Sequence, residues 1–178
     1  MIIVGIDPGT AHTGFGIISI IQNPKSKVKI RLKCLDYGVI ETTPSLSPEQ
    51  RLRRIYLEVS KLLKKYNPKI LAVENVYFFK NAKTITSVSE AKGVILLAAA
   101  KKKIEVQELS PPQVKMSVCG YGRAEKKQIE KRVKRILGLK EIPKPDDAAD
   151  ALAIAICCSR LKKSTRGLTP HHFLYKAQ

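Results

Sequence analysis

Two kinds of hydrophobic pattern alternate along the chain. Five short runs are rich in apolar and β-branched residues, as strands are, and the first is apolar at almost every position, like a strand covered on both faces. The third run partly alternates apolar with polar residues, which is typical of an edge strand. The predicted strands are residues 2–7, 14–21, 28–41, 70–77 and 104–109. The first three follow one another closely and predict an antiparallel meander.

Apolar residues recur at helical spacing between and after the later strands. Ser47 is suited to an N-cap, Pro48 to the first helical position and Gln50 to the third residue after the cap. The pair Asn67-Pro68 ends that helix. The predicted helices are residues 48–66, 81–102, 111–118, 124–137 and 146–162. Three strands followed by alternating helices and strands predict an α/β fold.

The length of 178 residues fits one domain with a substantial core. We expect this domain to span residues 1–163, because residues 164–178 are polar and basic, contain Gly167 and Pro170, and predict a mobile C-terminal tail. No tract is long and apolar enough to cross a bilayer or to resemble a signal peptide. The four cysteines form no CxxC pair, which favours reduced thiols in a cytoplasmic protein over disulfides or a zinc site.

The charge balance points to a polyanionic partner. Lys and Arg number 33 and Asp and Glu number 15, so the formal net charge is +18. Nucleic acid is favoured over a membrane, because the sequence shows neither an amphipathic anchor nor a lipidation signal. A surface that is basic for other reasons, such as a generally basic proteome or a thermophilic source, remains the alternative.

Acidic residues stand at the ends of three predicted elements. Asp7 ends the first strand and Glu74 follows the apolar run of the fourth, so parallel neighbouring strands would bring both to one sheet edge. Asp147 and Asp150 are three residues apart and share a face of the last helix. Asp146 competes for nearly the same face. Ordinary helix capping would explain Asp147 or Asp150 taken singly, and a turn carboxylate would explain Asp7.

Four clustered carboxylates would repel one another unless cations lay among them. Hard oxygen ligands suit Mg²⁺ or Mn²⁺. Two such ions activate a water and stabilise the leaving oxygen in phosphodiester hydrolysis. The acids, together with the basic charge, therefore favour a metal-dependent nuclease.

Five segments resemble the successive blocks of the RuvC family of Holliday-junction resolvases, in the same order and spacing, over about residues 1–160. They are GIDPGTAHTGFG, LAVENVYFFKNAKT, SEAKGV, GYGRAEKKQI and DDAADALAIAI. The resemblance implies an RNase H-like fold with a five-stranded mixed sheet, three strands antiparallel and then two parallel, flanked by helices. It also implies a homodimer that makes paired symmetric nicks in four-way junction DNA with two Mg²⁺ per active site, Mn²⁺ being an alternative.

The same resemblance assigns the acids. Asp7, Glu74, Asp147 and Asp150 match the family's catalytic, metal-binding positions. Asp146 falls just outside the D-A-A-D block and is ranked below them.

The resemblance also assigns DNA contacts. Lys115 and Lys126 match lysines that face DNA near the scissile phosphate, although a solvated helix face is the ordinary explanation of a lysine. Tyr77 matches an aromatic position after the catalytic Glu, where the family often has Phe. Together with Phe78 and Phe79 it would offer a surface for stacking on an unpaired base, with core packing as the rival for at least one ring.

Two other functions compete with junction resolution. GIDPGT is similar to the first phosphate loop of an actin or Hsp70 type ATPase, but those proteins need two such domains and a second glycine-rich loop. A non-catalytic junction-binding protein would keep the basic surface and lose the acids, all four of which are present. Cooperation with the branch-migration proteins RuvA and RuvB follows from the family resemblance alone, because no docking segment is recognisable.

Overall fold

A five-stranded sheet forms the centre of the molecule. The computed structural model describes residues 1–21, 31–75 and 82–164. The strands are β1 (Ile2–Asp7), β2 (His12–Ile21), β3 (Arg31–Glu41), β4 (Ile70–Glu74) and β5 (Glu105–Leu109). Their spatial order is β3-β2-β1-β4-β5. β1, β2 and β3 pair antiparallel, whereas β1, β4 and β5 pair parallel, which confirms the predicted mixed sheet with residues 31–41 at its edge.

Strand boundaries differ from the sequence prediction at three places, the smallest difference being at β5, which begins at Glu105 and not at residue 104. β2 begins at His12, not at residue 14, because its ladder with β3 continues to the pair His12 and Glu41. β4 ends at Glu74, and Asn75 lies outside the strand although its N–H still bonds to the carbonyl of Leu109 at 2.8 Å. The strand was predicted to continue to residue 77, and this prediction is wrong because the strand ends before Asn75.

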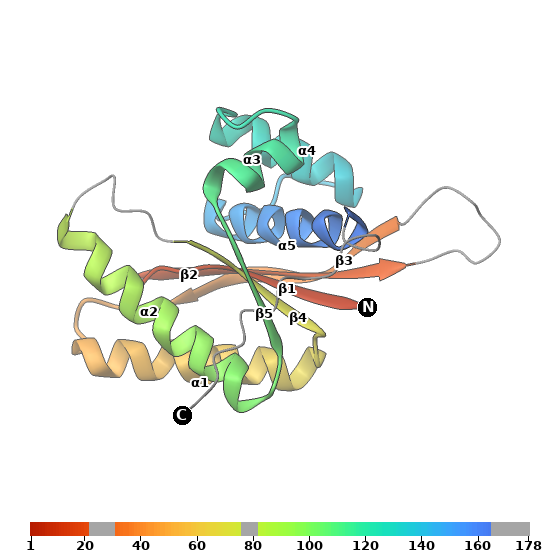
Figure 1. Cartoon of the computed structure of the whole chain (residues 1–178). Coiled ribbons are helices and arrows are strands. Elements are labelled where there is room, and N and C mark those ends of the chain that lie inside the picture. Colours follow the sequence, from red (N-terminus) through yellow and green to blue (C-terminus); the bar gives the residue numbers. More distant parts are fainter. Residues whose placement is uncertain (22–30, 76–81, 165–178) are drawn as a thin grey trace, which may run out of the picture.

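Helices cover both faces of the sheet. They are α1 (Pro48–Tyr66), α2 (Ala82–Lys101), α3 (Pro111–Cys119), α4 (Lys126–Leu137) and α5 (Asp146–Ser164). Figure 1 shows α1 and α2 on one face, and α5 on the other with α3 and α4 beyond it. Each face has its own apolar core: one cluster joins the sheet to α1 and α2, and the other joins it to α3, α4 and α5. No helix in the described part of the chain combines the length and apolar character needed to span a membrane.

Capping residues set the helix boundaries. The backbone N–H of Ser47 donates to the Gln50 side chain at 3.1 Å, as the sequence predicted for the start of α1. Ser110 and Gln113 form the same arrangement at the start of α3. The predicted helix at 124 starts two residues later, because Glu125 occupies the N-cap of α4.

Candidate active site

Asp7 and Glu74 end neighbouring parallel strands. The ladder between β1 and β4 pairs Ile6 with Val73, so the next residue of each strand, Asp7 and Glu74, reaches the same edge of the sheet. Burial, together with the nearby charges of Glu74, Asp150 and Asp147, raises the pKa of Asp7 to about 8, against an opposing effect of Lys126. The structure thus brings the four predicted acids into one electrostatic group.

A hydrogen-bonded frame fixes the turn after Asp7. The Thr13 hydroxyl donates to the Gly9 carbonyl at 2.5 Å, and the Thr42 hydroxyl donates to the Thr10 carbonyl at 2.5 Å. Arg51 Nε in turn donates to the Thr42 oxygen at 2.7 Å. Both threonines are buried. The sequence analysis missed this frame, since residues about 30 positions apart carry no local signal of pairing.

Glycines let α5 lie directly on the sheet. A Cβ atom on Gly14 would collide with the carbonyl oxygen of Asp147, and one on Gly5 would collide with that of Ala151. A Cβ atom on Gly16 would also collide with the helix backbone, at Leu152. The close approach at Gly14 places the acidic first turn of α5 next to the end of β1. Alternate glycines facing an alanine-rich helix were the available sequence signal, and it was overlooked.

Glu74 and Asp150 are partly buried members of the same acidic group. Burial, together with the charge of Asp150, raises the pKa of Glu74 to about 7, against an opposing effect of Lys115. Burial also raises the pKa of Asp150, against which Lys126 acts. The effect of burial on these acids thus outweighs that of the two lysines, and added positive charge would stabilise the ionised acids.

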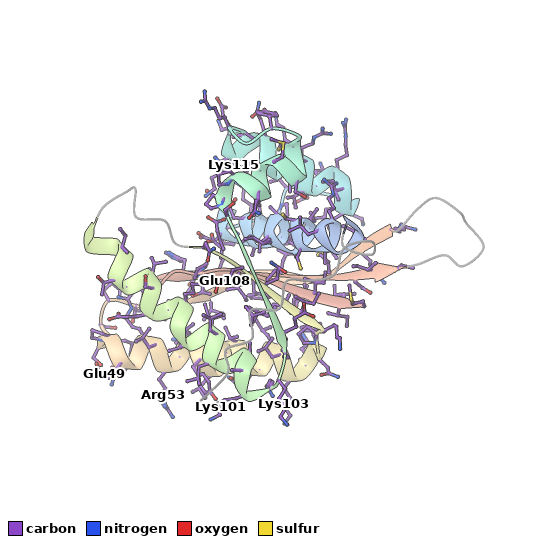
Figure 2. All side chains as sticks on the ribbon, in the orientation of Figure 1. Glu49, Arg53, Lys101, Lys103, Glu108 and Lys115 are labelled. Atoms are coloured by element: carbon purple, nitrogen blue, oxygen red, sulfur yellow. The ribbon has the colours of Figure 1, made fainter. Side chains whose placement is uncertain are left out.

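Lys115 and Lys126 border the acids from α3 and α4. Lys126 Nζ lies 3.2 Å from Asp150 Oδ2. Both lysines line a cavity of about 220 Å³ together with Glu74 and Asp150. Figure 2 shows Lys115 at α3. The cavity places cationic donors and carboxylates side by side, as a phosphate-processing site requires.

Asp146 occupies a different position from its neighbours. Its side chain is 49% exposed and lies 3.4 Å from Lys126 Nζ and 3.6 Å from Lys144 Nζ. Hydrogen bonding and the charge of Lys126 lower its pKa, whereas Asp7, Glu74 and Asp150 all have raised values. Asp146 thus belongs to a surface ion-pair group at the rim.

The donor set fits a hard divalent cation by its chemistry. All four acids offer carboxylate oxygens, the ligands that Mg²⁺ prefers. Among the described residues, however, no three His, Cys, Asp or Glu side chains form a ready-made metal site. Charge interactions act over longer distances than a metal–oxygen bond, which explains how the acids influence one another without forming a closed ligand set.

Two predicted features lie outside the described residues. The aromatic positions Tyr77 and Phe78, with Phe79, fall in residues 76–81, and residues 165–178 hold most of the predicted tail. The proposed domain limit at residue 163 lies within α5, which extends to Ser164.

The raised pKa of Asp7 predicts a pH-dependent stability difference. The value is about 8 in the fold against 3.8 for an ordinary Asp, so the folded state holds the extra proton between these pH values and stability falls as pH rises through that window. In EDTA, Asp7→Asn should therefore raise the Tm by at least about 3 °C at pH 8, because about 1 kcal/mol corresponds to about 2–4 °C at this length. The gain should disappear near pH 4.

Thermal melts of both proteins across this pH range provide the measurement. Asp146→Asn is the matched control, and it should show no gain at pH 8 because the pKa of Asp146 is lowered in the fold. A Tm difference for Asp7→Asn that stays constant from pH 4 to pH 8 would contradict the assignment.

Comparison with known proteins identifies the family. The sequence model described as "Crossover junction endodeoxyribonuclease RuvC" matches residues 3–158. A protein of that name from Fusobacterium nucleatum is 53% identical over 156 residues, which cover 88% of this chain and 78% of the relative. Another from Thermotoga petrophila is 48% identical over 170 residues, covering 94% and 99%.

Solved structures agree with the sequence relatives. The structure of Thermus thermophilus RuvC superposes with a TM-score of 0.83 at 33% identity, covering 92% of this chain and 96% of that one. The same protein in complex with a Holliday junction substrate gives a TM-score of 0.81 at 30% identity and the same coverage. Family, fold and the end-of-strand acids agree, and the chain belongs to the RuvC family of crossover junction endodeoxyribonucleases.

Proposed function

We propose that this chain resolves Holliday junctions by nicking two opposed strands symmetrically. The observation that carries the proposal is the electrostatic group of Asp7, Glu74, Asp147 and Asp150, which stands beside a cavity lined by two lysines. The relative whose structure contains a Holliday junction substrate supports the choice of substrate. Metal-assisted phosphodiester hydrolysis is the reaction that such a donor set serves.

Asp7, Glu74, Asp147 and Asp150 are the proposed ligands of divalent metal, and Mg²⁺ is the proposed ion, two per site, with Mn²⁺ as a substitute. A divalent cofactor accords with membership of the family. When bound, the metal would supply an activated water and charge stabilisation at the phosphate. The raised pKa values of Asp7 and Glu74 supply the reason: added positive charge lets both acids ionise at neutral pH.

Lys115 and Lys126 are proposed to hold the phosphate next to the acids. Lys126 Nζ already lies 3.2 Å from Asp150 Oδ2, but the Lys126 side chain is 49% exposed and its ammonium has three donors, so donors are left for a DNA oxygen. Burial opposes the charge of Lys126, but the charge of Asp150 raises its pKa and keeps it protonated. The lysine therefore supplies a fixed positive charge at the rim of the cavity.

We further propose that the active unit is a homodimer, because a junction has two equivalent strands to cut and each domain carries one acidic group. RuvA and RuvB are the proposed partners in branch migration. Tyr77 and Phe78 are proposed to stack on an exposed base, and the basic residues after 163 to support DNA binding. Sedimentation across the working concentration range tests the dimer.

A panel of substrates tests the function. Purified protein is incubated with a synthetic four-way junction, a linear duplex of the same sequence and an RNA–DNA hybrid, each with Mg²⁺ or EDTA. Paired nicks restricted to the junction and dependent on metal are expected. Cleavage of the hybrid would instead indicate a ribonuclease, and ATP turnover without cleavage would indicate the ATPase alternative.

Lys126→Ala should lower both junction affinity and cleavage rate. One lost phosphate contact reduces the slope of log affinity against log salt by about 1. Binding is measured in EDTA at several salt concentrations, followed by single-turnover cleavage in Mg²⁺. Lys61→Ala is the control, because Lys61 pairs with Glu58 on the exposed face of α1, and it should leave both quantities unchanged. An unchanged salt slope for Lys126→Ala would remove Lys126 from the DNA interface.

A further inference from the structure

Lys92 of α2 binds two groups at the end of the sheet where Glu74 stands. Its Nζ donates to Asn75 Oδ1 at 2.7 Å and to Glu108 Oε2 at 2.5 Å. The Lys92 side chain is only 15% exposed, which is unusual for a lysine. A partly buried ammonium needs such partners, because desolvation is costly without them. The three groups therefore form one defined contact.

This contact lies on the α2 side of the sheet, opposite to the face on which the Glu74 side chain lies. Val73 belongs to the core shared with α1 and α2, and side chains alternate between faces, so Glu74 points to the α5 side. Glu108 pairs in register with Val73 and shares its face. Figure 2 shows Glu108 at the level of the sheet. Lys92 thus reaches its two partners from the α2 side.

Lys92 also links β4 to β5 at the point where β4 ends. Asn75 is the first residue after β4, and its N–H donates to the Leu109 carbonyl at 2.8 Å. Glu108 precedes Leu109 on β5. The ammonium holds the side chain of Asn75 against β5 while this backbone bond holds its main chain. Together they fix the backbone that carries Glu74.

Lys92 bonds on the α2 side of the sheet, whereas Glu74 points to the α5 side. An effect of Lys92 on Glu74 would therefore act through the backbone at Asn75, to which Lys92 is hydrogen-bonded. This distinguishes Lys92 from Lys115 and Lys126, which border the cavity.

We propose that Lys92 is a positioning residue for Glu74, acting through Asn75 and Glu108. The inference rests on the proposed function, in which Glu74 is a metal-binding acid. Lys92 sets the point at which β4 ends and thereby the direction in which Glu74 enters the acidic group. A small displacement of a catalytic group is enough to slow a reaction about 10-fold to 100-fold.

Lys92→Met tests the proposal, because methionine keeps most of the length and apolar stem and loses the ammonium. At saturating junction, single-turnover cleavage in Mg²⁺ should fall at least about 10-fold, while the junction Kd in EDTA stays within about 2-fold. Amide hydrogen exchange should accelerate in the peptide that contains Asn75. Lys92→Arg restores a cationic donor and should recover most of the rate. Lys61→Met, at an exposed i,i+3 pair, is the matched control and should change none of these quantities.

Glu108→Gln gives a second test that does not endanger folding, since the Glu108 side chain is 44% exposed. It weakens one of the two contacts and should give a smaller rate loss with faster exchange at Asn75. Normal rate and normal exchange in both variants would overturn the proposal. So would a lower junction affinity of Lys92→Met with a shallower salt dependence, which would make Lys92 a phosphate contact. Cleavage by Glu74→Gln at the wild-type rate would instead remove the proposed function itself.

Discussion

Asp7→Asn is expected to abolish junction nicking while junction binding stays equal or becomes tighter. The amide keeps the shape of the side chain and removes a charge that a metal ion needs. Metal ions contribute several kcal/mol to such reactions, and about 1.4 kcal/mol is tenfold in rate, so a loss of about 1000-fold is expected. Binding should not weaken, because the substitution removes a carboxylate and no cation from a site that faces phosphate.

The measurements are junction binding in Ca²⁺ or EDTA and single-turnover cleavage in Mg²⁺. Because the amide avoids the cost of burying a charge and also removes the charge repulsion within the acidic group, the variant should fold at least as stably as the wild type in EDTA. A loss of activity therefore could not be attributed to unfolding. Weaker binding by Asp7→Asn would place Asp7 in the DNA interface and contradict its proposed role as a metal ligand.

Gly14→Ala is expected to produce the other large effect. The added Cβ would collide with the backbone carbonyl of Asp147, so the first turn of α5 has to move away from the sheet. Overpacking of this kind costs about 1–3 kcal/mol, or a Tm loss of about 2–12 °C at this length. The cleavage rate should fall even at temperatures where the variant is fully folded, because the displaced turn carries Asp147 and Asp150. Melting curves and single-turnover rates at a temperature where the variant is folded provide the comparison.

Gly93→Ala is the matched control. Gly93 lies inside α2, and a Cβ there would meet no atom within 4 Å. Alanine is the better helix former by about 1 kcal/mol, so stability should hold or rise. If Gly14→Ala cleaved like Gly93→Ala, the close approach of α5 to β2 would have no part in forming the site.

The residue pattern was sufficient for the elements and for the antiparallel pairing of the first three strands. Strand and helix patterns are local, so the caps at Ser47 and Pro48 and the alternation in residues 31–41 were readable directly. The end-of-strand acids were also readable, because parallel strands must end at one edge. The resemblance to the RuvC family then supplied the fold and the junction substrate.

Long-range contacts were beyond a single sequence. The Thr42 to Thr10 bond and the Lys92 to Asn75 bond join distant residues whose identities alone do not specify a partner. The direct contact of α5 with Gly14 had a visible signal in the alternating glycines, but the packing partner was not evident. These contacts set the positions of the acids in space. Composition and spacing therefore predicted which acids form the site but not the contacts that position them.

Single-turnover nicking of a four-way junction in Mg²⁺ by a set of carboxamide variants tests the central claim most directly. Glu74→Gln, Asp147→Asn and Asp150→Asn should each bind the junction and fail to nick it. Asp146→Asn should retain most activity, because Asp146 lies at the rim with Lys126 and Lys144. Nicking at near the wild-type rate by a folded Glu74→Gln or Asp150→Asn variant would contradict the assignment of a four-carboxylate metal site.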